Sequence, residues 1–189
     1  MSRNETRRFD AVLFDWDDTL CGATPHRYGH AQEVARRVGV ELTLLEIYRA
    51  CARAERSMRH SWAEFVARLP AELDLPSEHH ETFIDGYLAR DGWKTFQLFD
   101  DVLDVIDHIG RHELRVGVLS NNEEVAQHVE RMDVQHRFEI VVSPSTFGVG
   151  KPDPLIFTRT AEQLGVAAVR TIYVGDSYDN DVVGARAAG

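Results

Sequence analysis

Three aspartates follow a short apolar run near the start of the chain. Residues 11–14 are Ala-Val-Leu-Phe, the pattern of a strand that is buried on both faces of a parallel sheet. The run ends in Asp15, Asp17 and Asp18. Carboxylates this close together repel one another unless a proton or a cation intervenes. The segment is therefore either an acidic turn after a core strand or part of a catalytic site.

Three later apolar segments also end in residues that are useful for phosphoryl chemistry. Ser120 follows the first, Lys151 lies in the loop after the second, and Asp176 follows the third. Because these strand candidates alternate with helical patterns, we expect a parallel sheet with helices on both faces. The carboxyl ends of such strands share one edge of the sheet, where ligands bind. Polar residues that follow all four strands therefore favour the catalytic interpretation. The three strand candidates are 114–119, 138–142 and 171–174.

Helical patterns fill most of the remaining chain. Residues 25–90 predict an all-helical block of four helices, in which one helix ends at Pro70. Asp153-Pro154 predicts a helix start, because the carboxylate can cap the helix and proline suits its first position. We expect a loop from 143 to 150 and a last helix from about 179 to 189.

Composition limits the classes of protein that the chain can represent. Its 189 residues fit one domain, or one domain with an insertion, and 43% hydrophobic residues argue against disorder. We find no apolar run long enough to span a membrane and no secretory signal. Cys21 and Cys51 are too isolated for a disulfide framework or a zinc site, which fits a reducing cytoplasm. The net charge of −10 opposes nucleic-acid binding, so we expect a small-molecule partner.

The polar residues that follow the four predicted strands, together with their sequence neighbours, resemble the signatures of the haloacid dehalogenase superfamily, and its phosphatase branch in particular. The signatures are Asp-Trp-Asp-Asp-Thr at 15–19, Leu-Ser-Asn at 119–121, Gly-Lys-Pro-Asp-Pro at 150–154 and Gly-Asp-Ser-Tyr-Asp-Asn-Asp at 175–181. The resemblance implies an α/β fold, with a Rossmannoid parallel sheet formed by residues 1–20 and 97–189. Residues 21–96 would be an inserted helical cap domain of the first type, as in subfamily I.

The resemblance also implies catalytic roles and a cofactor. Asp15 would be the nucleophile that forms an aspartyl-phosphate, and Asp17 would be the general acid and then the general base. Mg²⁺ would be held by Asp15, the backbone carbonyl of Asp17, and Asp176. The substrate would be the phosphomonoester of a small metabolite, and neither nucleic acid nor membrane is an expected partner.

Further residues would bind the phosphoryl group or support the site. Ser120 and the backbone N–H of Asn121 would bind phosphoryl oxygens, and Lys151 would neutralise their charge. Thr19 would contribute to phosphate binding or orient Asp17, although a purely local role in the turn stays open. Ser120 could instead be a simple helix cap. Asp181 would position Lys151 or a metal-bound water.

Two other functions stay open at this point. A phosphosugar mutase, similar to beta-phosphoglucomutase, would use Asp15 and Asp17 in the same way but pass the phosphoryl group to a second hydroxyl. A non-catalytic binding protein with this fold is the other alternative. A dehalogenase is disfavoured, because that branch of the family lacks the carboxylate that Asp17 supplies here.

The end of the chain and the helical block raise further expectations. Relatives usually continue beyond the helix that ends at Gly189, so we expect 171–174 to be an exposed edge strand unless it is covered otherwise; monomer and dimer both stay open. His26 and His30 form either a metal pair or hydrogen-bonding histidines. Four arginines at helical spacing form either a cationic stripe or a solvated face. These are Arg49, Arg53, Arg56 and Arg59.

Overall fold

The computed structural model describes residues 7–23, 26–56, 62–89 and 96–189. The chain divides into two compact units. The core unit comprises Met1–Gly22 and Gln97–Gly189, and the insert unit comprises Ala23–Phe96. The core unit contains a parallel sheet with helices and the insert unit contains helices, which confirms the predicted α/β class with a helical insertion.

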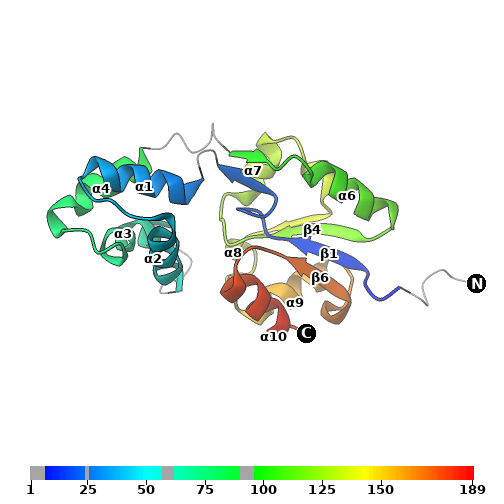
Figure 1. The fold of residues 1–189 in the computed structure, drawn as a ribbon. Helices are drawn as coiled ribbons and strands as arrows, with labels where there is room; N and C mark the ends of the chain where they lie inside the picture. The colour runs from blue at the N-terminus through cyan, green and yellow to red at the C-terminus, as the bar shows by residue number, and fades with distance from the viewer. Residues whose placement is uncertain (1–6, 24–25, 57–61, 90–95) are drawn as a thin grey trace, which may run out of the picture. The chain divides into compact units, whose positions relative to one another are not determined.

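The core unit is built on a four-stranded parallel sheet (Figure 1). Its strand order is β5-β4-β1-β6, so β1 lies between β4 and β6, and β6 forms one edge. Phe14 at the end of β1 stands opposite Val118 and Val174. The chain runs from β1 to β4 and β5 and later returns to β6 on the other side of β1. The carboxyl end of β1 therefore lies where open α/β sheets bind ligands. The strands are Ala11–Phe14 (β1), Arg115–Leu119 (β4), Ile140–Val142 (β5) and Thr171–Val174 (β6).

Helices cover both faces of this sheet. Figure 1 shows α6 and α7 on one face and α9 and α10 on the other. Ile156 and Phe157 of α9 pack against Leu119 and Val142 of the sheet. Asp153 caps α9 by accepting a hydrogen bond from the Leu155 N–H at 2.9 Å, which confirms the predicted helix start. The helices are Val102–Arg111 (α6), Val125–Arg131 (α7), Pro154–Gln163 (α9) and Gly184–Ala187 (α10).

Parts of the core unit differ from the prediction. The expected loop at 143–150 contains a short helix, α8 (Pro144–Phe147), because Ser143 and Thr146 form a capping box and Gly148 ends the helix with a φ of 72°. The predicted final helix is instead a π-helical segment, Tyr178–Val183, followed by α10. Short 3-10 turns occupy Gln135–Arg137 and Ala168–Arg170.

The insert unit contains four α-helices in its described residues. They enclose a buried apolar cluster that includes Val34, Ile47, Phe65 and Phe83. The prediction that a helix ends at Pro70 is wrong, because α3 continues through this residue. Pro70 lies near the end of α3, and the Leu73 N–H still donates to the Leu69 carbonyl at 2.9 Å. The helices are Arg27–Arg37 (α1), Leu44–Arg56 (α2), Trp62–Glu72 (α3) and His80–Leu88 (α4), the last preceded by a 3-10 turn, Ser77–His79.

Two short strands were not predicted. β2 (Cys21–Ala23) and β3 (Phe96–Leu98) form a separate two-stranded sheet. Gly22 in β2 lies so close to Phe99 that an added Cβ would fall 2.9 Å from the ring. Three residues are too few to show the alternation by which a strand is recognised in a sequence.

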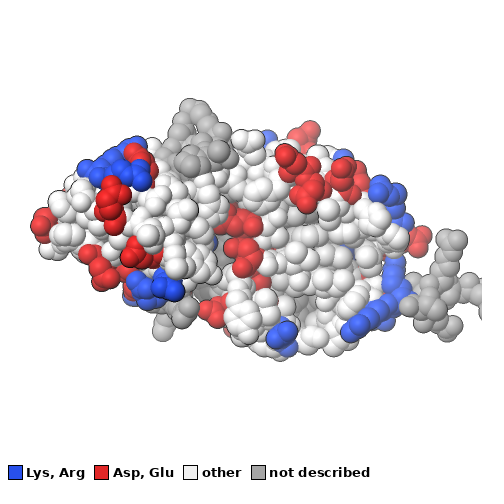
Figure 2. Space-filling model, viewed as in Figure 1, with Lys and Arg blue, Asp and Glu red and all other residues white. Residues whose placement is uncertain are grey.

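The surface is mainly acidic, as the net charge requires. Figure 2 shows acidic side chains over both units, and some of them gather over α6. Asp104 and Asp107 are exposed on that helix. Among the residues that the structure describes, no helix has the length and apolar character that a membrane crossing requires.

Candidate active site

A lysine buried between two aspartates forms the centre of the candidate site. Lys151 Nζ lies 2.9 Å from Asp15 Oδ1 and 2.6 Å from Asp181 Oδ1. Lys151 is only 2% exposed and Asp181 only 1%. The ammonium also donates to the Tyr173 hydroxyl at 2.9 Å, and this hydroxyl donates to the Leu119 carbonyl at 2.7 Å. Each of the three ammonium hydrogens can therefore be matched to an acceptor, which fixes the position of the charge.

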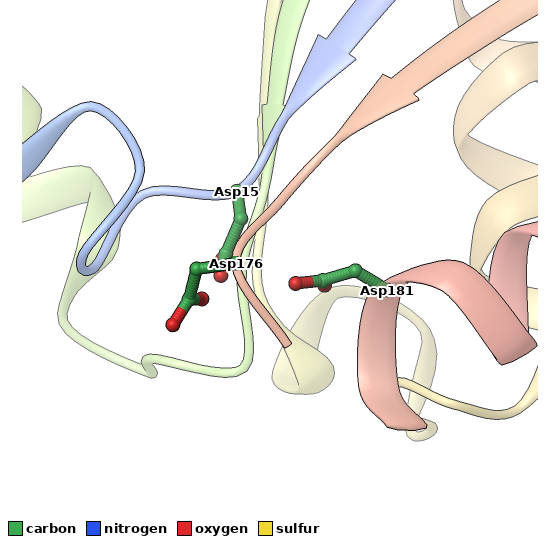
Figure 3. A group of neighbouring side chains, drawn as sticks. All are labelled: Asp15, Asp176 and Asp181. Atoms are coloured by element: carbon green, nitrogen blue, oxygen red, sulfur yellow. The ribbon is translucent and has the colours of Figure 1, made fainter. Parts of the chain in front are cut away.

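These side chains come from segments that are far apart in the sequence. Asp15 directly follows β1, and its carboxylate extends past the end of the strand (Figure 3). Lys151 lies between α8 and α9, and Asp181 projects from the π-helical segment that follows β6. Parallel strands bring their carboxyl ends to one edge, so the topology assembles the group as the sequence pattern predicts.

Burial and charge act against each other at this centre. Burial raises the pKa of Asp15 and the Asp181 carboxylate adds to that shift, while Lys151 opposes it. Burial would lower the pKa of Lys151, but the two carboxylates outweigh it and raise the pKa instead. The ammonium therefore stays charged. With Asp176 at the rim, one positive charge faces three carboxylates, so the cluster carries an excess of negative charge.

The acidic cluster has the donor set of a hard-cation site. Asp15, Asp176 and Asp181 each offer a carboxylate oxygen, and these oxygens lie within 4.8 Å of one another. Figure 3 shows the three side chains meeting from two strand ends and the helical segment. All of these donors are oxygen, which suits Mg²⁺. The donor set and the excess negative charge both fit a divalent cation.

The carboxylates of the cluster differ in which of their oxygens already accept hydrogen bonds from the protein. Asp181 accepts from Lys151 on Oδ1 and from the Ser177 N–H on Oδ2, at 2.8 Å. Asp15 Oδ1 accepts from Lys151 and from the Trp16 N–H, at 2.8 Å. No described residue donates a hydrogen bond to Asp15 Oδ2. This oxygen is therefore the one left for a ligand or for chemistry, whereas Asp181 acts on Lys151.

Asn122 holds the carboxylate of Asp17. The Asn122 amide lies 3.0 Å from Oδ2 and 3.3 Å from Oδ1 of Asp17, and the Ser120 hydroxyl lies 3.5 Å from Oδ2. The Thr19 hydroxyl is buried and makes no hydrogen bond to any residue that the structure describes. This geometry does not support the sequence prediction that Thr19 orients Asp17. Sequence reasoning missed Asn122, although its place beside the second signature was a usable signal.

Asn121 positions the backbone of Lys151. Its side-chain amide donates to the Lys151 carbonyl at 2.9 Å, and its side-chain oxygen accepts from the Lys151 N–H at 2.8 Å. This reciprocal pair joins the β4 exit to the loop before α9. The sequence had suggested phosphate binding by the Asn121 backbone N–H and helix capping by Asn121 or Asn122, but not this contact with Lys151. Ser120 is buried, and its hydroxyl accepts from the Asn122 N–H at 3.2 Å, so a local capping contact exists beside any ligand role.

The candidate residues of the insert unit make structural contacts. His30 Nε2 lies 3.1 Å from the Tyr87 carbonyl oxygen, and the His26 side chain accepts from the Tyr28 N–H at 3.4 Å. Arg53 pairs with Glu72 at 2.8 Å on the surface. These contacts favour the hydrogen-bonding interpretation of the histidines and, for Arg53, the solvated helix face. Arg59 lies outside the described residues.

Comparisons with known proteins agree with this architecture. The profile of a hydrolase family, haloacid dehalogenase-like hydrolase, matches residues 9–189. The chain is similar to a phosphoglycolate phosphatase of Xanthomonas campestris, with 29% identity over 184 residues that cover 95% of this chain and 79% of the relative. It is also similar to a glyceraldehyde 3-phosphate phosphatase of Methanopyrus kandleri, with 28% identity over 95% of this chain and 80% of the relative.

A solved structure shares the fold. A HAD family hydrolase from Deinococcus radiodurans superposes with a TM-score of 0.75 and 24% identity, covering 96% of this chain and 78% of that one.

A substitution at Gly175 tests how closely the chain packs against the Asp181 side chain of the Lys151–Asp181 pair. A Cβ at Gly175 would fall 2.8 Å from the Cβ of Asp181 and closer still to its carboxylate. We expect Gly175→Ala to displace Asp181 and to lower the free energy of unfolding by about 1–3 kcal/mol, measured by urea denaturation. Gly110→Ala is the matched control, because nothing lies within 4 Å of its added Cβ. The control should be neutral or stabilising by up to ~1 kcal/mol. Equal effects of the two changes would contradict the packing argument.

Proposed function

The chain belongs to the haloacid dehalogenase-like hydrolase family, and we propose that it is a Mg²⁺-dependent phosphomonoesterase that works through an aspartyl-phosphate on Asp15. The relatives named above are phosphatases, and the chain is a phosphatase of this family. One observation carries the proposed mechanism. The Asp15 carboxylate lies 2.9 Å from a buried lysine at the carboxyl edge of the sheet, with its Oδ2 unused by the described residues.

In the first step, a carboxylate oxygen of Asp15 attacks the phosphorus atom and the bond to the ester oxygen breaks. Oδ2 suits the attack, because Oδ1 is held by Lys151 and the Trp16 N–H. Lys151 balances negative charge beside the attacked group. Its link to Asp181 and Tyr173 keeps the ammonium in place while charge moves nearby.

Asp17 is the proposed general acid and general base. It would give a proton to the leaving ester oxygen and later take a proton from the water that attacks phosphorus. The second attack breaks the bond between phosphorus and Asp15, releases inorganic phosphate and restores the carboxylate. The two hydrogen bonds from Asn122 support this role, because an acid–base group must be held in a fixed orientation.

Asp15 and Asp176 would hold Mg²⁺, together with the backbone carbonyl of Asp17. The ion would supply positive charge that polarises the phosphoryl group. The excess negative charge of the cluster supports this assignment. Ser120 and the backbone N–H of Asn121 would bind phosphoryl oxygens.

The proposed substrate is a small phosphorylated metabolite. This class is supported by the relatives, whose names specify phosphorylated compounds of two or three carbons. The insert unit is proposed to act as the cap domain that the resemblance implies, so the choice among such compounds would depend on its residues.

The covalent mechanism is tested by trapping the intermediate. With phosphoglycolate, glyceraldehyde 3-phosphate or p-nitrophenyl phosphate as substrate and Mg²⁺ present, we expect release of inorganic phosphate. Acid quenching followed by borohydride reduction should convert phosphorylated Asp15 to homoserine, which peptide mass spectrometry detects. Asp15→Asn should lose at least about a thousandfold in kcat, because the amide is a poor nucleophile.

The control for this experiment is Asp17→Asn. It should retain Asp15 but lose about 10²–10⁴-fold in kcat, because proton transfer is impaired. Undiminished turnover in Asp15→Asn, or homoserine at another position, would overturn the covalent mechanism. A product with the phosphoryl group on a second hydroxyl, in place of inorganic phosphate, would favour the mutase.

Asn122 and Thr19 form a matched pair of variants. Asn122→Ala removes the side-chain amide that donates to both carboxylate oxygens of Asp17, so we expect kcat to fall about tenfold or more with a smaller change in KM. Thr19→Val preserves shape and removes only a hydroxyl that makes no hydrogen bond to a described residue, so kcat should change little. Steady-state kinetics of both variants measure these changes in kcat and KM. A larger loss of kcat in Thr19→Val than in Asn122→Ala would restore the role that the sequence suggested.

A further inference from the structure

His108 lies on the exposed surface of α6, and His112, also exposed, caps the C-terminal end of this helix one turn further on. Their Nε2 atoms approach to 3.2 Å, and their ring centroids are 4.7 Å apart with an angle of 58° between the planes. Residues four positions apart on a helix are neighbours on one face, so the backbone itself places the rings side by side. Neither ring belongs to the proposed catalytic machinery.

The distance between the two nitrogens suits a shared metal ion. Imidazole nitrogen binds Zn²⁺ at about 2.0–2.1 Å, so two such ligands on a tetrahedral or octahedral ion are about 2.9–3.4 Å apart. The observed 3.2 Å falls within this range without any movement of the helix. A neutral pair can hold the same spacing with one N–H donated between the rings, and a metal ion would take the place of that hydrogen.

Both acidic and basic side chains surround the pair. Asp104 lies one turn before His108 and lines the same shallow hollow, together with Asp101 and Asp107. Three arginines act against binding. Arg7 Nη1 donates to the His112 carbonyl at 2.7 Å, and Arg137 pairs with the Asp107 carboxylate. Arg111 Nη2 lies 3.4 Å from His108 Nδ1, a long contact from an exposed side chain that must give way when Nε2 binds a metal. Asp101 and Asp104 supply the negative charge beside His108 that favours a cation.

We propose that His108 and His112 bind a transition-metal ion of the Zn²⁺ or Ni²⁺ class at the C-terminal end of α6. Imidazole nitrogen suits these ions, whereas Mg²⁺ prefers oxygen ligands, so this site differs in chemistry from the acidic cluster around Asp15. It differs in position as well. His112 is three residues before the start of β4, at the amino-terminal edge of the sheet, whereas Asp15 follows the carboxyl end of β1. The bound ion would link the last turn of α6 to its C-cap residue, His112.

Calorimetric titration tests the site in the full chain. Zn²⁺ is added near neutral pH with Mg²⁺ in large excess, so that the acidic cluster is saturated. We expect one binding event that His108→Asn and His112→Asn each weaken about tenfold or more and that the double variant abolishes. His136→Asn, which removes another exposed histidine, is the matched control and should leave the affinity unchanged.

A further variant tests the proposal through a gain of affinity. Arg111→Ala removes a positive charge and frees His108 Nδ1, so we expect Zn²⁺ to bind several-fold more tightly. Zn²⁺ should also raise the melting temperature of the wild type and leave that of the double histidine variant unchanged. All of these exposed substitutions are checked for folding by circular dichroism. Equal Zn²⁺ affinity in the wild type and the double variant, or no binding to the wild type, would overturn the proposal.

Discussion

A buried ammonium ion requires acceptors, and in this protein that requirement ties three separate segments to one point. Lys151 is almost completely buried, and an unpaired charge at such a position is strongly destabilising. Its acceptors are Asp15 after β1, Asp181 after β6, and the hydroxyl of Tyr173 within β6. Asn121 holds the lysine backbone from the end of β4. The charge can be satisfied only when the strands are in their native order, so the site and the sheet depend on each other.

The same arrangement supports the chemistry that we propose for the site. One lysine offsets only one of the three carboxylates around it, and the remaining negative charge supports the proposed binding of a divalent cation. Asp181 accepts hydrogen bonds from Lys151 and from the Ser177 N–H, which supports its proposed role as a positioning residue, and Asp15 is the proposed nucleophile. Gly175 is part of this construction, since only a residue without a side chain leaves room for the Asp181 carboxylate.

Elements determined by local patterns were predictable from the sequence. The apolar run at 11–14 forms β1, and Asp153-Pro154 begins α9, because burial period and capping chemistry act over a few residues. Contacts that depend on tertiary position were not predictable. The amide of Asn122 reaches Asp17 across 105 positions of sequence, and Tyr173 reaches Lys151 across 22. The continuation of α3 through Pro70 has a similar cause, since buried Leu69 and Leu73 hold the turn that proline weakens.

The central claim is that Lys151 and Asp181 form one electrostatic unit, and a double-mutant cycle on unfolding tests it most directly. Urea denaturation would give the free energy of unfolding for Lys151→Met, Asp181→Asn and the double variant. Breaking a buried pair by removing one partner costs about 3–5 kcal/mol, so each single change should be strongly destabilising. The double variant should lose at least ~1 kcal/mol less than the sum of the two, because the Lys151–Asp181 interaction is then lost only once. Losses that add to within ~0.5 kcal/mol would contradict the account.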